Sequence, residues 1–119
     1  AWERLGRLRL RRFDRDGARE ALERARATEP SVEGLLDLAL VANLQGDVGA
    51  EVSACEQATV IAPESPAAWA RLAHALARTD RISDCLQACK RALELADDPE
   101  VRDLREQVAR LSPRELEAA

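Results

Sequence analysis

Three cysteines and one histidine are the residues of this chain whose types and spacing could do chemistry. Cys85 and Cys89 are four residues apart, so they would share one face of a helix. With Cys55 and His74 they form a group that has the donor types of a tetrahedral zinc site or of a catalytic nucleophile. The sequence has no tyrosine and no glycine-rich loop of the kind that cradles phosphate. Chemistry in this chain would therefore depend on these four side chains coming together.

Charge and composition exclude several classes of function. The formal net charge is −4, so the chain lacks the excess of cations that a general nucleic-acid or membrane surface needs. No apolar stretch approaches the ~20 residues that span a bilayer. Three cysteines cannot all pair internally, which favours a reducing compartment. We therefore expect a cytoplasmic protein that binds neither nucleic acid nor membrane through this segment.

The chain contains three copies of one pattern. The second and third copies are offset by 34 residues, and this offset superposes Leu38 on Leu72, Ala39 on Ala73, Ala54 on Ala88 and Cys55 on Cys89. The first copy fits after closing one residue of the connecting loop, and its matching residues are Trp2, Leu5, Gly6, Leu22, Ala25 and Pro30. A repeat of this length is typical of an array of small structural units.

Each copy reads as a pair of helices. Apolar residues recur at spacings of three and four, which places them on one helix face, and polar turns or prolines interrupt the pattern. The predicted helices lie near 1–12, 17–28, 32–45, 48–61, 66–79 and 82–95, with a capping helix at 99–111. Ser112 and Glu115 match a capping box, which predicts that residues 112–119 begin a further helix or a linker.

These residues resemble the tetratricopeptide repeat family, a helix–turn–helix unit of 34 residues with Trp, Leu, Gly, Ala and Pro at fixed places. The first copy carries the pattern as Trp2-x-x-Leu5-Gly6, and the third copy carries Trp69-x-x-Leu72. The resemblance implies an all-α fold, a right-handed superhelical solenoid of three helix-turn-helix repeats with a C-terminal capping helix. We expect the repeat domain to cover 1–111, with repeats at about 1–30, 31–64 and 65–97.

The resemblance also bears on the cysteines. All three stand where this repeat takes small buried residues, and free cysteine packs as a small hydrophobic residue. We therefore interpret them as packing residues, and we expect no metal, no cofactor and no enzymatic activity. Glu51 departs from the pattern, since a small residue is usual at its place.

The same resemblance implies where a ligand would bind. In this family the first helices of successive pairs line a concave surface, and ligands usually lie in it. Leu36 and Leu40 are one helical turn apart and off the core positions, so they would form an exposed apolar centre. Carried onto this chain, the predicted protein-binding residues are Arg7, Arg11, Leu36, Leu40, Asn43, Arg71, His74 and Arg78.

We expect the partner to be a peptide or an amphipathic helix, with an apolar anchor over the two leucines and acidic flanks that meet the arginines. The chain would then be a protein-interaction scaffold. The family's best-known ligand chemistry is a clamp of Lys and Asn that holds the C-terminal carboxylates of chaperone peptides, and we do not expect it here. The matching places lack Asn and include two acids: they hold Glu3, Arg7, Asp37, Ala67 and Arg71.

Three alternatives remain open on the sequence alone. The two leucines could pack against the capping helix, a neighbouring domain or a second copy. The chain could be a structural or regulatory module of a larger multidomain bacterial protein, such as a transcription regulator. Residues 111–116 resemble the opening of a DNA-binding helix-turn-helix module in such regulators. The N-terminal face behind Trp2 could also form a homodimer.

Overall fold

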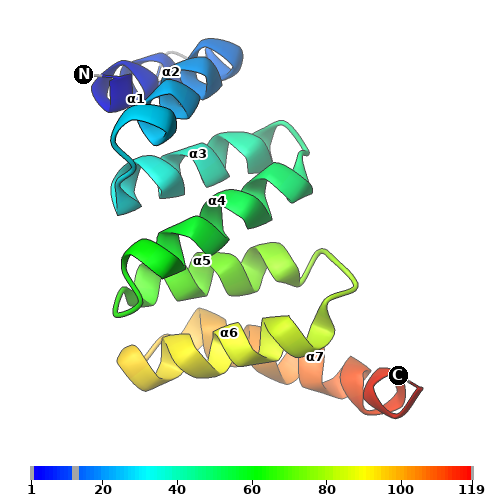
Figure 1. Cartoon of the computed structure of the whole chain (residues 1–119). Helices are drawn as coiled ribbons and strands as arrows, with labels where there is room; N and C mark the ends of the chain where they lie inside the picture. The colour runs from blue at the N-terminus through cyan, green and yellow to red at the C-terminus, as the bar shows by residue number, and fades with distance from the viewer. Residues whose placement is uncertain (1, 12–13, 119) are drawn as a thin grey trace. The chain divides into compact units, whose positions relative to one another are not determined.

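The computed structural model describes residues 2–11 and 14–118 of the chain, with side chains as far as residue 110. Within these ranges it contains seven helices and no strand (Figure 1). The expected all-α class is therefore confirmed. Two compact units make up the chain, Ala1–Ala62 and Pro63–Ala119.

The first unit is made of two helix pairs. α1 (Trp2–Arg11) packs on α2 (Arg15–Thr28), and α3 (Val32–Leu44) packs on α4 (Val48–Ile61). Contacts between α2 and α3 join the pairs, and α1 also touches α3. The first helices of the two pairs, α1 and α3, are therefore neighbours.

Short polar side chains begin three helices of this unit. Asp14, Ser31 and Asp47 each accept a hydrogen bond from the backbone N–H three residues later, at 2.9, 3.0 and 3.1 Å. Such caps satisfy N–H groups that have no partner within the helix. In the turn between α3 and α4, Gly46 has a φ of 74°, which side chains disfavour. Local sequence signals thus set these boundaries.

The core of the first unit consists of small and medium side chains. Leu22, Leu35 and Leu38 are fully buried among alanines from α2, α3 and α4. Gly6 lets α1 lie against α2, because a Cβ at this residue would come within 2.6 Å of Leu22 Cγ. A larger residue there would force the two helices or the leucine to shift.

The second unit contains α5 (Pro66–Leu76), α6 (Ile82–Leu95) and α7 (Pro99–Ala118). α5 and α6 form the third helix pair, and α7 packs on both of them. Val101 and Val108 of α7 are buried, so this helix covers apolar surface of the pair, as expected of a capping helix. None of the described helices has the length and apolar character needed to cross a membrane.

Two predicted helix ends differ from the structure by three residues or more. α5 ends at Leu76 rather than near residue 79, because the N–H groups of Arg78 and Thr79 bond to carbonyls three residues earlier and tighten the chain into a turn. The predicted new helix at Ser112 is wrong, since α7 continues to Ala118. A proline within a helix removes one N–H donor and bends the helix, but the residues after Pro113 are good helix formers that continue it.

Candidate functional site

The predicted apolar centre lies on α3. Leu36 and Leu40 are half-buried, whereas Leu35, Leu38 and Ala39 of the same helix are fully buried. α3 therefore carries apolar side chains beyond its core face. We use the name α1–α3 surface for the five predicted residues of the first unit, which are Arg7, Arg11, Leu36, Leu40 and Asn43.

Arg7 of α1 is held by two carboxylates. Its Nη2 lies 2.8 Å from Glu3 Oε1, and its Nε donates to Asp37 Oδ2 of α3 at 2.6 Å. The hydrogen bond to Asp37 and the charge of Asp37 raise the pKa of the Arg7 guanidinium above its ordinary value, and the charges of Glu3 and Glu33 add to this effect. Arg7 therefore ties α1 to α3, and its positive charge is offset within the chain.

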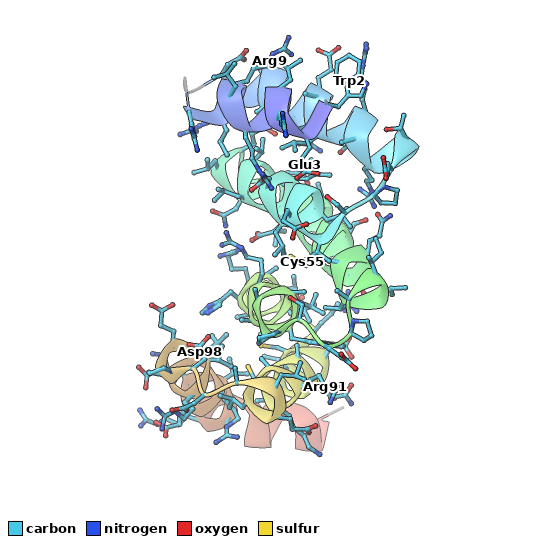
Figure 2. The ribbon with its side chains drawn as sticks, turned by 90° about the vertical axis from the view of Figure 1, so that its left-hand side faces the viewer. Trp2, Glu3, Arg9, Cys55, Arg91 and Asp98 are labelled. Atoms are coloured by element: carbon cyan, nitrogen blue, oxygen red, sulfur yellow. The ribbon has the colours of Figure 1, made fainter. Side chains whose placement is uncertain are left out.

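Glu3 forms a second link between α1 and α3. Its Oε2 accepts a hydrogen bond from Ser31 Oγ at 2.6 Å, and Ser31 Oγ accepts the N–H of Gly34 at 3.0 Å. Figure 2 shows Glu3 on the side of α1 that faces α3. Two carboxylates thus contact the Arg7 guanidinium and the charge of Glu33 also acts on it, so this end of the α1–α3 surface is acidic.

The other end of the α1–α3 surface holds a cation and an amide. Arg11, the last residue of α1, is exposed. Asn43 is half-buried near the end of α3, and its Nδ2 donates to Glu51 Oε1 of α4 at 3.4 Å. Glu51 is buried. Glu51, which departs from the repeat pattern, therefore orients the predicted binding residue Asn43. This contact depends on how α3 packs against α4.

The remaining three predicted residues belong to the second unit, and we call them the α5 group. Arg71 and His74 are half-buried and three residues apart on α5, so they lie on one side of the helix. Arg78 is exposed in the turn after α5. Because α5 is shorter than predicted, the helix itself positions Arg71 and His74 but not Arg78.

The cysteines pack as small side chains in the structure. None of the three forms a disulfide bond, and all three are fully buried. Cys85 Sγ donates to the carbonyl of Ala73 at 3.3 Å. A hydrogen bond with Cys89, together with burial, raises the pKa of the Cys85 thiol. Over the part of the chain that the structure describes, no three His, Cys, Asp or Glu side chains are placed so that they could hold a metal ion.

A cavity of about 360 Å³ lies in the first unit, at a place that the sequence analysis missed. The start of α1, the end of α2 and the loop before α3 form its walls. The lining residues are Trp2, Glu3, Ala25, Thr28, Glu29, Pro30 and Ser31. The sequence feature that could have predicted the cavity is that Trp2 and Pro30 both occupy fixed places of the repeat, which brings these segments together.

A known sequence family shares this architecture. The family model described as Tetratricopeptide repeat matches residues 42–108, more than half of the chain. No curated protein matches the sequence.

Several solved structures have the same fold. The first TPR domain of Spaghetti (RPAP3), bound to the HSP90 peptide SRMEEVD, gives a TM-score of 0.84 at 14% identity and covers 92% of this chain and 89% of that chain. The Sgt2 TPR domain from Aspergillus fumigatus gives 0.80 at 19% identity, covering 92% and 75%. The Yersinia enterocolitica type III secretion translocator chaperone SycD gives 0.72 at 15% identity, covering 92% and 77%. At these identities the likeness shows the fold alone.

Proposed function

Because this chain belongs to the tetratricopeptide repeat family, whose domains are protein-interaction modules, we propose that it binds a peptide or an amphipathic helix and catalyses no reaction. The observation that carries this proposal is the pair of half-buried leucines, Leu36 and Leu40, between two charged ends of the α1–α3 surface. Partly exposed apolar groups with charged surroundings are typical of partner sites. The Spaghetti domain, which shares the fold, is bound to a peptide.

The ligand that fits the α1–α3 surface has an apolar anchor over the two leucines. Recognition of this kind gains most from buried anchors, while charges at the rim steer and orient the ligand. An acidic flank of the ligand would meet the exposed Arg11. Arg7 would contribute indirectly by holding α1 to α3, since Glu3 and Asp37 already offset its charge.

The α5 group is proposed as a second contact for acidic residues. Arg71 and Arg78 carry guanidinium groups, which pair with carboxylates through two parallel hydrogen bonds. His74 adds an imidazole on the same side of α5 as Arg71. Replacing both arginines by Gln would weaken binding of an acidic ligand more at low than at high salt, because the lost interaction is electrostatic.

A peptide selection tests the proposal even though the natural partner is unidentified. Random dodecapeptides displayed on phage are selected on the immobilised chain, and the Leu40→Glu variant serves for counter-selection. We expect enriched sequences to combine large apolar residues with Asp or Glu. If no sequence is enriched over the variant, the proposal fails. The alternative is then favoured, in which this surface packs on neighbouring domains of a larger bacterial regulator.

Self-association through α1 is a further proposal about partners. Trp2 and Leu8 are 37% and 46% exposed, and large exposed apolar side chains favour association. Light scattering over a dilution series measures the mass of the particle. We expect a concentration-dependent dimer that Leu8→Glu shifts toward monomer, and a monomeric mass at every concentration would contradict this.

We also propose that the chain works in the cytoplasm. Its three cysteines form no disulfide bond, and cysteines remain as thiols where the compartment is reducing. Rapid alkylation of lysed cells, followed by mass spectrometry, measures the oxidation state of each thiol. Oxidised cysteines in freshly lysed cells would contradict this location.

A further inference from the structure

The cavity at the start of α1 has a chemistry of its own, separate from the leucine pair. Its volume of about 360 Å³ lies within the range of small-ligand sites. Two of its lining residues, Glu3 and Glu29, are acidic, and none of them is basic. Glu29 is exposed, and it caps α2 through its backbone N–H rather than through its carboxylate. The cavity therefore favours a cation over an anion.

The end of α2 adds further partial negative charge. Ala25 and Thr28 line the cavity from the last turn of α2 and Glu29 from its C-cap, where backbone carbonyls and the helix dipole are negative. Thr28 Oγ1 donates its proton to the carbonyl oxygens of Arg24 and Ala25, at 2.9 and 3.3 Å. The hydroxyl oxygen can therefore act only as an acceptor toward a guest.

Trp2 contributes an aromatic ring that already binds a guanidinium group. The Arg24 Cζ atom lies 4.6 Å from the centre of the Trp2 ring, which is a cation–π contact. Arg24 is not among the lining residues, and its Nη2 pairs with Glu20 Oε1 at 3.3 Å. Trp2 itself is 37% exposed and is one of the residues that line the cavity.

We propose that this cavity binds the guanidinium group of an arginine side chain from a partner polypeptide. The exposed carboxylate of Glu29 pairs with the planar fork of N–H groups, and the indole of Trp2 stacks on its face. Glu3 adds negative charge to the wall, although its two oxygens are already bonded to Arg7 and Ser31. The ammonium group of lysine is a compact, strongly hydrated charge and fits this combination less well. The site adjoins the α1–α3 surface at Glu3 but takes a ligand of the opposite charge.

The probe for this site is N-acetyl-arginine N-methylamide, and its control is the citrulline analogue, which has nearly the same shape without the charge. Proton–nitrogen NMR spectra follow the two indole N–H signals during a titration. Trp69 is the internal reference, because its Nε1 donates to the Pro63 carbonyl at 2.8 Å in the second unit. We expect a saturable shift of the Trp2 signal alone, with a Kd of about 1 to 10 mM. An equal shift with the citrulline analogue, or no saturable shift, overturns the proposal.

Two charge-neutralising variants locate the binding. Glu29→Gln removes an exposed carboxylate from the cavity, and Glu64→Gln removes another exposed carboxylate, from the second unit. We expect Glu29→Gln to raise the Kd of the arginine probe about threefold or more, and Glu64→Gln to leave it unchanged. Equal affinity of wild type and Glu29→Gln overturns the proposal. Free arginine serves as a second ligand, and tighter binding of free arginine than of the blocked probe overturns the assignment to a polypeptide.

Discussion

Charged side chains of the first unit bind one another across the helix pairs. Arg7 bonds Asp37 between α1 and α3, and Arg19 Nη2 donates to Asp47 Oδ2 between α2 and the cap of α4, at 2.9 Å. Partly exposed pairs of this kind contribute at most about 1 kcal/mol each. Their main effect is therefore to fix how the helices face each other and which charges remain for a ligand.

Asp47 provides a titration test at the residue scale. The hydrogen bonds from the Ala50 N–H and from Arg19 lower the pKa of Asp47 below its ordinary value of 3.8. A lowered folded-state pKa favours the folded state at pH values above the unfolded pKa, and this contribution is lost as the pH falls through the folded pKa. We expect an NMR titration to give a pKa below 3.8, and Arg19→Ala to raise it part of the way back.

The control for this titration is Arg24→Ala, which removes a cation of the same helix that pairs with Glu20 instead. The pKa of Asp47 should then be unchanged. A pKa of Asp47 at or above 3.8 in the wild-type protein would show that the cap of α4 is not formed as described.

Arg7→Ala tests the link between α1 and α3. The substitution leaves Asp37, whose side chain is only 25% exposed, without this counterion. We expect the free energy of unfolding in urea to fall by about 0.5 to 1 kcal/mol. Arg4→Ala, at an exposed position of the same helix, should change it by less than about 0.5 kcal/mol. Equal effects of the two substitutions would contradict the assigned role of Arg7.

At the scale of the helices, close packing of small residues decides which helices can form a pair. Gly6 allows α1 to approach Leu22 of α2, and alanines serve the same purpose in the other pairs. Caps and prolines set most helix ends, because these signals act within a few residues. The α1–α3 surface depends both on this close packing and on these helix ends.

Gly6→Ala tests the approach of α1 to α2. The new Cβ would lie 2.6 Å from Leu22 Cγ, so we expect overpacking to lower the free energy of unfolding by about 1 to 3 kcal/mol. The matched control is Gly49→Ala on α4, where the nearest atom that a new Cβ would meet is Asp47 Oδ1 at 3.8 Å. Because alanine favours helix over glycine, the control should not be destabilised. Urea unfolding of both variants measures the difference. A Gly6→Ala variant with the wild-type free energy of unfolding would refute the close approach of α1 to Leu22.

Sequence patterns could predict the helices wherever the signal is local. The predicted ranges 48–61 and 82–95 coincide with α4 and α6, which begin and end at polar turns. The end of α5 was predicted too late, because bonds between neighbouring backbone groups, which no single residue marks, close the turn there. The ion pair of Arg7 with Asp37 and the bond from Asn43 to Glu51 were not predictable, because they join side chains on different helices.

At the scale of the whole molecule, the internal repeat predicted the family, because three copies of one pattern constrain the fold far more than any single motif. The eight predicted binding residues are divided between the two compact units, five in the first and three in the second. The types of these residues predict a partner with an apolar anchor. The sequence alone could not predict which charges are offset within the chain. The structure shows this for Arg7, whose charge is offset by nearby carboxylates.

The central claim is that Leu36 and Leu40 form the centre of a peptide-binding surface. Isothermal titration calorimetry with one selected peptide compares wild type, Leu40→Glu and Val60→Glu. The control residue Val60 is 79% exposed on α4, so it takes the same kind of change outside the α1–α3 surface. Circular dichroism of each variant verifies that the helices remain.

We predict that Leu40→Glu raises the Kd of the peptide about tenfold or more, because it removes a buried apolar contact worth ~1.5–3 kcal/mol. Val60→Glu should leave the Kd unchanged. Binding of the peptide to Leu40→Glu with the wild-type Kd would contradict the account.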